Sequence, residues 1–134
     1  MKVRDLRRED EYIVVSKSFI GGYDRKVLTR LYQPIIGCFA FSLYLTLLSE
    51  LEFDRTISNE SRPHLSLIKL MNISLDDFVL AIGKLEGIGL VKTKLNKKNG
   101  VYNYNIFAPL SPLQFFDNPL LDSKYHKILG DAEY

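Results

Sequence analysis

The chain has 134 residues, of which 46% are hydrophobic, 25% are charged and one is cysteine. This balance is typical of a single folded domain with its own core, and it excludes disorder as the overall description. The formal net charge of +2 does not identify a nonspecific nucleic-acid binder, because such binding depends on neutralising many phosphates.

The compartment is indicated by Cys38 and by the amino terminus. Cys38 lies in the most apolar stretch, so we expect it to be a small buried hydrophobe, and a single cysteine favours a reducing compartment. The basic amino terminus runs into acidic residues 9–11 instead of an apolar signal core. Residues 31–49 are uncharged, but Pro34 and Gly37 interrupt them and leave a helix of core length. We therefore expect a cytoplasmic protein without a transmembrane helix.

The first predicted elements are a strand and two helices. Residues 12–18 contain a β-branched run and predict a strand that ends at the glycine pair 21–22. Asp24 is expected to cap a short helix that stops at Pro34. Residues 37–52 are apolar on nearly every side, so this helix is expected to be central and covered by protein all round.

Two further helices follow a polar loop that is predicted over residues 53–62. A short helix is expected over His64–Met71, directly after a proline that suits a helix start. Ser74 and Asp77 resemble a capping box at the start of a longer helix, and the glycines within 87–89 end it.

From residue 90 the apolar pattern alternates, and Asn99-Gly100 separates two strand-like runs, which predicts a β-hairpin. Two helices followed by a hairpin are the order of a winged helix-turn-helix domain. The predicted fold is α+β and mainly α: a winged helix-turn-helix with an N-terminal strand and a C-terminal helical extension. We expect a flexible basic N-terminus at 1–11, the winged-helix domain at 12–108, and a proline-punctuated extension at 109–134.

The alternative function is DNA binding, with phosphate contacts through the basic wing and the basic N-terminus of the predicted domain. Asp76 and Asp77 stand where a base-reading helix meets the duplex, so sequence-specific readout, and with it a role as transcription regulator, is disfavoured. The hairpin instead carries candidate phosphate contacts, with Tyr102 and Tyr104 as neighbours for stacking. The alternative is a solvated hairpin whose lysines protect an exposed strand edge, which is the commoner situation. The candidate DNA-backbone contacts are Lys92, Lys94, Lys97 and Lys98.

A second candidate surface is suited to protein contact. Leu80, Gly83 and Gly87 share the outward face of the longer helix, and an interior glycine costs about 1 kcal/mol relative to alanine, so it often has a packing reason. The alternative is an ordinary exposed helix with two tolerated glycines. The terminal helix, predicted over residues 120–129, adds three more candidates on one stripe. They are Leu121, Tyr125 and Ile128.

The sequence predicts no catalytic residue, no metal site and no cofactor. His64 and His126 are the only histidines, and neither has a ligand partner at helical or hairpin spacing. No phosphate-binding loop with its lysine occurs. We therefore expect that the protein is not an enzyme.

Four segments, taken in order, carry a family resemblance: residues 31–37 (LYQPIIG), 40–44 (AFSLY), 84–90 (KLEGIGL) and 109–116 (PLSPLQFF). With these, the chain resembles the amino-terminal domain of the replication initiation and membrane attachment proteins of low-GC Gram-positive bacteria, helicase co-loaders called DnaB, which are related in fold to DnaD. The resemblance implies a primosome domain that self-associates, as a homodimer or a larger oligomer, and helps to load the replicative helicase during DNA replication initiation.

The resemblance also implies the partners of such a domain: itself, other primosome proteins and the replicative helicase. Family members carry a further helical domain to which much single-stranded DNA binding is ascribed, so DNA binding by the present chain is expected to be weak. The family name suggests that the protein associates with a membrane without a transmembrane segment. The resemblance implies no catalytic residue.

Overall fold

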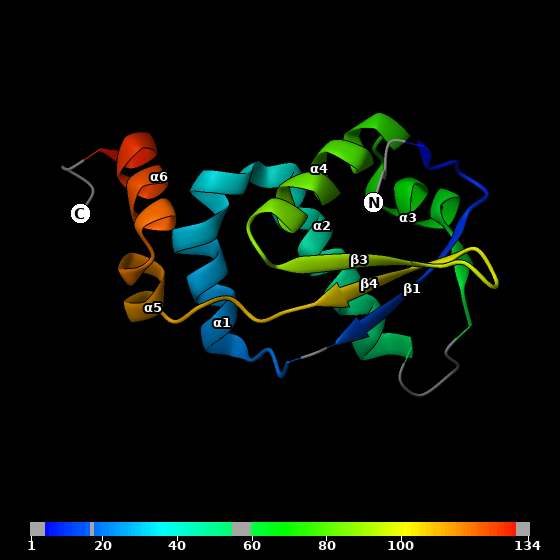
Figure 1. Cartoon of the computed structure of the whole chain (residues 1–134), viewed down its shortest axis with the longest axis horizontal. Helices are drawn as coiled ribbons and strands as arrows, with labels where there is room; N and C mark the ends of the chain where they lie inside the picture. The colour runs from blue at the N-terminus through cyan, green and yellow to red at the C-terminus, as the bar shows by residue number, and fades with distance from the viewer. Residues whose placement is uncertain (1–4, 17, 55–59, 131–134) are drawn as a thin grey trace.

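The structure, a computed structural model, describes residues 5–16, 18–54 and 60–130. Its helices are α1 (Gly22–Val27), α2 (Gln33–Asp54), α3 (His64–Met71), α4 (Leu75–Gly87), α5 (Pro112–Asp117) and α6 (Pro119–Leu129), and a π-helical turn, Leu28–Tyr32, joins α1 to α2. Its strands are β1 (Glu11–Ser16), β2 (Arg62–Pro63), β3 (Val91–Asn96) and β4 (Val101–Ile106). Helices α3 and α4 and the β3–β4 hairpin form the predicted winged helix-turn-helix, with an N-terminal strand and C-terminal helices around it (Figure 1).

The four strands form one sheet in the order β2-β1-β4-β3. The hairpin is antiparallel, and its four-residue turn, 97–100, is longer than an Asn-Gly pair alone would make. Gly100 takes a φ of 72° there, and its N–H donates to the carbonyl of Asn96 at 2.7 Å. Strand β1 runs parallel to β4, with Tyr12 opposite Tyr102. The sheet thus joins the beginning of the chain to the hairpin.

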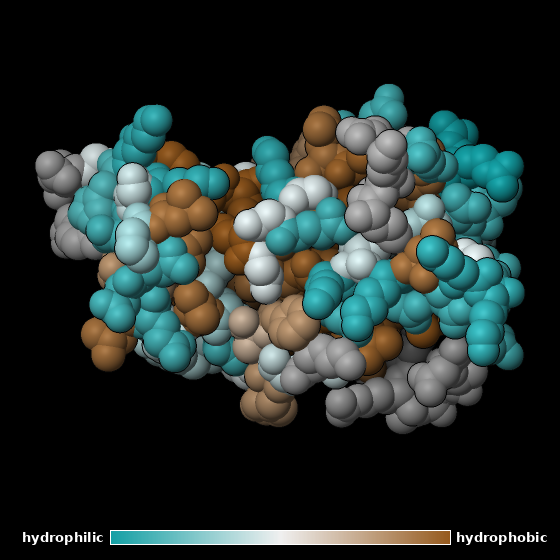
Figure 2. All heavy atoms as spheres, in the orientation of Figure 1, coloured by the Kyte–Doolittle hydropathy of each residue, from teal (hydrophilic) through white to brown (hydrophobic). Residues whose placement is uncertain are grey.

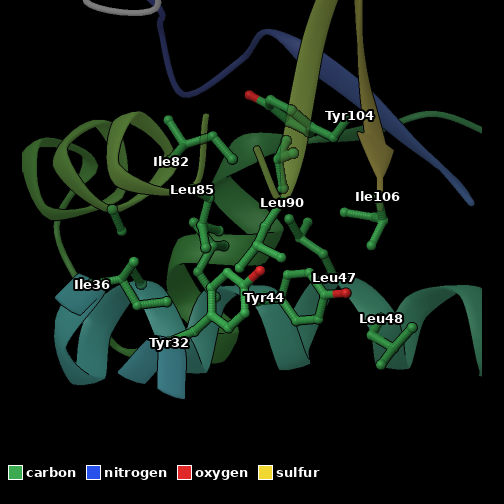
Figure 3. Close-up of a cluster of buried hydrophobic side chains, with 14 of the residues drawn as sticks. Tyr32, Ile36, Tyr44, Leu47, Leu48, Ile82, Leu85, Leu90, Tyr104 and Ile106 are labelled. Atoms are coloured by element: carbon green, nitrogen blue, oxygen red, sulfur yellow. The ribbon is translucent and has the colours of Figure 1, made fainter. Parts of the chain in front are cut away.

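The core lies where α2 meets α4 and the sheet. Figure 3 shows Tyr44 and Leu47 of α2 facing Leu85 of α4 and Ile106 of β4. All four are fully buried. Burying one leucine or isoleucine side chain stabilises a fold by about 1.5–3 kcal/mol, so this contact is a principal source of stability.

Pro34 does not end a helix, contrary to expectation. The turn Leu28–Tyr32 is π-helical, and the Gln33 N–H donates to the carbonyl of Leu28, five residues back. In a regular helix the proline ring clashes with the carbonyl four residues earlier, and a widened turn relieves that clash. The break comes instead at Gly37, whose φ of 83° and ψ of 170° are open to glycine alone.

The prediction that the central helix is covered all round is also wrong. Cys38 is exposed, not buried, and the side chain of Phe39 is 53% exposed. The opposite side of α2 supplies the core. The sequence hides this asymmetry because apolar residues of α2 face both solvent and core, so no helical period separates the two sides.

Asp24 does not cap α1 but occupies its third position. The N-cap is Gly21, whose backbone N–H donates to the Asp24 carboxylate at 2.9 Å. The acidic side chain therefore reaches back to the helix start, as the glutamate of a capping box does. The predicted Ser74 capping box of α4 is confirmed, as is the helix end at 87–89.

The amino-terminal residues 5–11 are part of the domain, which corrects the expectation of a flexible tail there. Leu6 is buried in the core. The carbonyls of Asp10 and Arg8 accept the N–H groups of His64 and Leu65 at 2.9 and 3.0 Å. Because the first N–H groups of a helix lack partners within it, these carbonyls do for α3 what a capping side chain would do. Residues 1–4 lie outside the described residues, as do residues 55–59 of the predicted loop.

The C-terminal extension packs on the start of α2. The ring of Phe115 in α5 is fully buried and lies 5.1 Å, centroid to centroid, from that of Tyr32. The Tyr32 hydroxyl accepts the N–H of Leu110 at 2.9 Å, and the Tyr44 hydroxyl donates to the carbonyl of Phe107 at 2.7 Å. Two core tyrosines thus hold the segment that leads from the hairpin to α5.

One helical stretch of the described residues, Gly22–Leu51, is long and apolar enough to cross a membrane by length and composition. Core helices pass the same test. Tyr44 and Leu47 within it are fully buried, and Gly37 interrupts its helical geometry. The buried side of this stretch therefore belongs to the core of the domain.

Candidate functional site

The wing presents the four predicted lysines on the open edge of the sheet. Strand β3 has β4 on one side and no described strand on the other. All four lysines are exposed, and none forms an ion pair with a residue that the structure describes. They are Lys92 and Lys94 on β3 and Lys97 and Lys98 in the turn. The wing therefore carries cations that are free to meet an external anion.

The expected stacking partners of these lysines are not available. Tyr102 is 7% exposed and Tyr104 is fully buried. Both rings lie against His64, with centroids 5.5 and 5.6 Å from the imidazole. The alternation of β4 turns them towards the core, because every second residue of a strand faces the same side. Stacking of bases on these tyrosines is therefore excluded.

His64 is a buried structural residue. Its Nδ1 lies 2.6 Å from the carbonyl oxygen of Asp10, which only accepts, so Nδ1 donates and Nε2 accepts the hydroxyl of Tyr104 at 2.7 Å. Burial lowers the pKa of His64 and raises that of Tyr104. Among the described residues there is no group of three or more His, Cys, Asp and Glu that could hold a metal ion.

The amino-terminal end of α4 is acidic, as predicted. The Ser74 hydroxyl accepts the N–H of Asp77 at 3.0 Å, and the Asp77 carboxylate accepts the N–H of Ser74 at 3.3 Å. Asp76 beside them is exposed. Two carboxylates at the positive end of the helix dipole stabilise α4 and repel phosphate there.

The outward face of α4 is open. The side chain of Leu80 is 67% exposed. A Cβ atom added at Gly83 or Gly87 would meet nothing within 4 Å. These three residues, which we call the α4 face, therefore expose apolar surface and bare backbone together.

The α6 residues do not extend this face as expected. Leu121 and Tyr125 are buried, at 6% and 9% exposure, because they attach α6 to its own domain. Ile128 is 52% exposed and stays available. Of the six predicted protein-contact residues, the α4 face and Ile128 remain at the surface.

A groove that the sequence did not reveal lies between the end of α4, the start of α2 and the start of α6. Its volume is about 450 Å³. Ile35 and Ile88 lie in its apolar lining, with Lys84 on one wall and Lys124 on another. Figure 2 shows hydrophobic surface in this hollow. Because the lining comes from separate segments of the chain, no local pattern announces the groove.

Comparison with known proteins agrees with this fold. A family model described as the DnaB N-terminal winged helix domain matches residues 6–134. The curated "Replicative helicase loading/DNA remodeling protein DnaB" of Staphylococcus aureus is 30% identical over 120 residues, which cover 87% of this chain and 25% of that protein. A crystal structure of primosome protein DnaB, residues 1–300, from Geobacillus stearothermophilus has a TM-score of 0.88 and 38% identity, covering 96% of this chain and 49% of that one.

The chain thus spans about a quarter of the curated relative and half of the solved one. The resemblance that its sequence segments suggest is confirmed over nearly the whole length. The chain belongs to the DnaB N-terminal winged helix domain family.

Proposed function

We propose that this domain is a self-association module of a primosome protein that helps to load the replicative helicase during the initiation of DNA replication. The names of its relatives support the process, and the α4 face supports the mode of action. In a DNA-reading winged helix, the second helix turns cations and amides outward. Here the outward face of the second helix, α4, carries Leu80 and two exposed glycines, and its amino-terminal end is acidic. Such a surface is suited to a protein partner.

Self-association through the α4 face is tested by substituting Leu80. Light scattering over a range of protein concentrations should give the wild type a molecular mass of at least two chains. Leu80→Asp should weaken association about tenfold or more, because a charge would be buried where an apolar side chain packed. Leu113→Asp is the matched control, since Leu113 is 83% exposed on α5, away from the α4 face. A wild type that stays monomeric at every concentration overturns the proposal.

The second candidate function is contact with DNA phosphates through the wing. The four exposed lysines favour it, since none pairs with an acidic residue in the described part of the chain. Fluorescence anisotropy with a DNA duplex should show binding that weakens as salt rises. Changing Lys92, Lys94, Lys97 and Lys98 to glutamate should abolish it. For the wild type, a plot of log affinity against log salt should have a slope of about −3.6 if each of the four lysines meets a phosphate. Absence of wild-type binding at low salt rules this function out.

A further inference from the structure

The groove beside α6 has the form of a peptide site. Its 450 Å³ falls in the range of about 300–1,000 Å³ typical of ligand clefts, enough for a few side chains but not for a whole domain. Its lining is mainly aliphatic, with Ile35 and Ile36 from α2, Ile88 after α4 and Leu120 from α6. Leu120 is 60% exposed, so apolar surface reaches the mouth of the groove.

Gly87 leaves one wall of the groove without a projecting side chain. It lines the groove at the last turn of α4, and a Cβ atom there would meet nothing within 4 Å. A side chain at this position would project into the open space of the groove without displacing any part of the domain. The backbone of α4 is therefore accessible to a bound segment.

The charge of the groove is one-sided. Lys84 and Lys124 line it, and none of its lining residues is acidic. The carboxylate of Asp122, on α6 beside the groove, lies 3.2 Å from Nε2 of His126 and is not part of the lining. The amino-terminal end of α6 also adjoins the groove, and there the side chain of Asn118 accepts the N–H groups of Leu120 and Leu121, so the positive charge of the groove comes from the two lysines.

From these features we propose that the groove binds a short segment of a partner protein in which apolar side chains are flanked by carboxylates. The aliphatic lining accepts the apolar side chains, and the two lysines pair with the acidic ones. A nucleic-acid strand fits less well, because sequence-tolerant strand binding uses aromatic faces for stacking. The aromatic residue of the lining, Tyr32, is 1% exposed, and its hydroxyl is engaged with Leu110.

A library of random peptides tests which side chains the groove prefers. A phage-displayed library of random peptides, selected on the intact chain, should enrich sequences that combine Asp or Glu with Leu, Ile or Phe. The enriched peptide is then synthesised with a fluorophore, and its affinity is measured by polarisation. Enrichment of basic peptides, enrichment of purely apolar peptides, or no enrichment at all would each overturn the proposal.

Matched substitutions test whether the peptide binds in the groove. Gly87→Leu should weaken the enriched peptide about tenfold or more by filling the groove, whereas Gly83→Leu, four residues earlier on α4 and outside the lining, should leave the affinity unchanged. Lys124→Glu should weaken it about fivefold, and Lys127→Glu, on the same helix but outside the lining, should not. Thermal unfolding must match the wild type for each variant, and the lysine pair decides the matter if Gly87→Leu fails to fold.

The outcomes also separate this site from the other proposed functions. Loss of peptide binding in both glycine variants would place the peptide on the α4 face and overturn the groove. A single-stranded oligonucleotide that binds the wild type but not Gly87→Leu would assign the groove to nucleic acid and overturn the proposal as well. Self-association is measured independently by light scattering, so a monomeric chain that still binds the peptide retains the groove and loses only the proposed self-association.

Discussion

At the scale of single residues, His64 shows how a polar side chain is accommodated in an aromatic core. The imidazole lies among the rings of Tyr12 and Phe78, with centroids 4.9 and 5.3 Å away, and both of its nitrogens are hydrogen-bonded. The sequence offered no sign of this role, because Asp10 and Tyr104 are 54 and 40 residues away along the chain. Sequence spacing excludes a local metal site but does not reveal long-range partners.

The stability of the domain should depend on pH through His64. Its pKa in the folded state lies below the ordinary 6.5, because burial penalises the charged form. As the pH falls through 6.5, the unfolded chain takes up a proton at this residue while the folded one does not. The stabilisation present above pH 6.5 is therefore lost as the pH falls towards the folded-state pKa. Urea unfolding between pH 7.5 and pH 5 measures this loss.

Substituting His64 isolates its share of that dependence. His64→Phe should lower the free energy of unfolding at pH 7.5 by about 2 kcal/mol, because the hydroxyl of Tyr104 and the carbonyl of Asp10 lose their partner. The deficit should shrink at pH 5, where the wild type has lost part of its own stability. Phe115→Leu, which trims a buried ring but removes no titratable group, is the control and should keep the wild-type slope. An unchanged slope in His64→Phe would assign the pH dependence to other groups.

At the scale of elements, the helix–hairpin order was predictable, whereas the path of α2 was not. The Ser74 capping box, the end of α4 and the change to strand alternation after residue 90 are local signals, and the structure confirms each. Pro34 and Gly37 lie three residues apart, and both are helix breakers. A π-helical turn absorbs the first, and a backbone conformation open only to glycine makes the second the true break. The composition of a short segment does not show which of two nearby helix-breaking residues interrupts the helix.

Two glycine-to-alanine substitutions should have opposite effects. Gly37→Ala should lower the free energy of unfolding by about 1–3 kcal/mol, since a Cβ atom is strained at φ 83° and ψ 170°. Gly83→Ala should raise it by about 0.4–1 kcal/mol, because that glycine sits inside α4 with open space around it. Chemical denaturation of both variants under the same conditions measures the two signs. Equal effects would show that the kink at Gly37 does not require glycine.

At the scale of the whole molecule, the sequence predicted the winged helix and its two flanking parts but not how these parts pack. The stripe of Leu121 and Tyr125 predicts an apolar helix face correctly, yet composition does not say whether that face meets its own domain or another molecule. The contact between the rings of Tyr32 and Phe115 attaches the extension to its own domain, and these two residues come from distant parts of the chain. The groove exists only because α6 docks in this way, so it too escapes local prediction.

The parallel pairing of β1 with β4 has a consequence for how the chain acquires its structure during synthesis. Residues 12–16 find their parallel partner strand at residues 102–106, so the sheet closes a loop that contains nearly every other element of the winged helix. Contacts between such distant segments slow folding, because the entropy of closing the loop is lost before the contacts form. A nascent chain shorter than about 106 residues lacks the strand that completes β1. Cotranslational folding of this domain therefore waits for the wing to emerge from the ribosome, although its helices are made first.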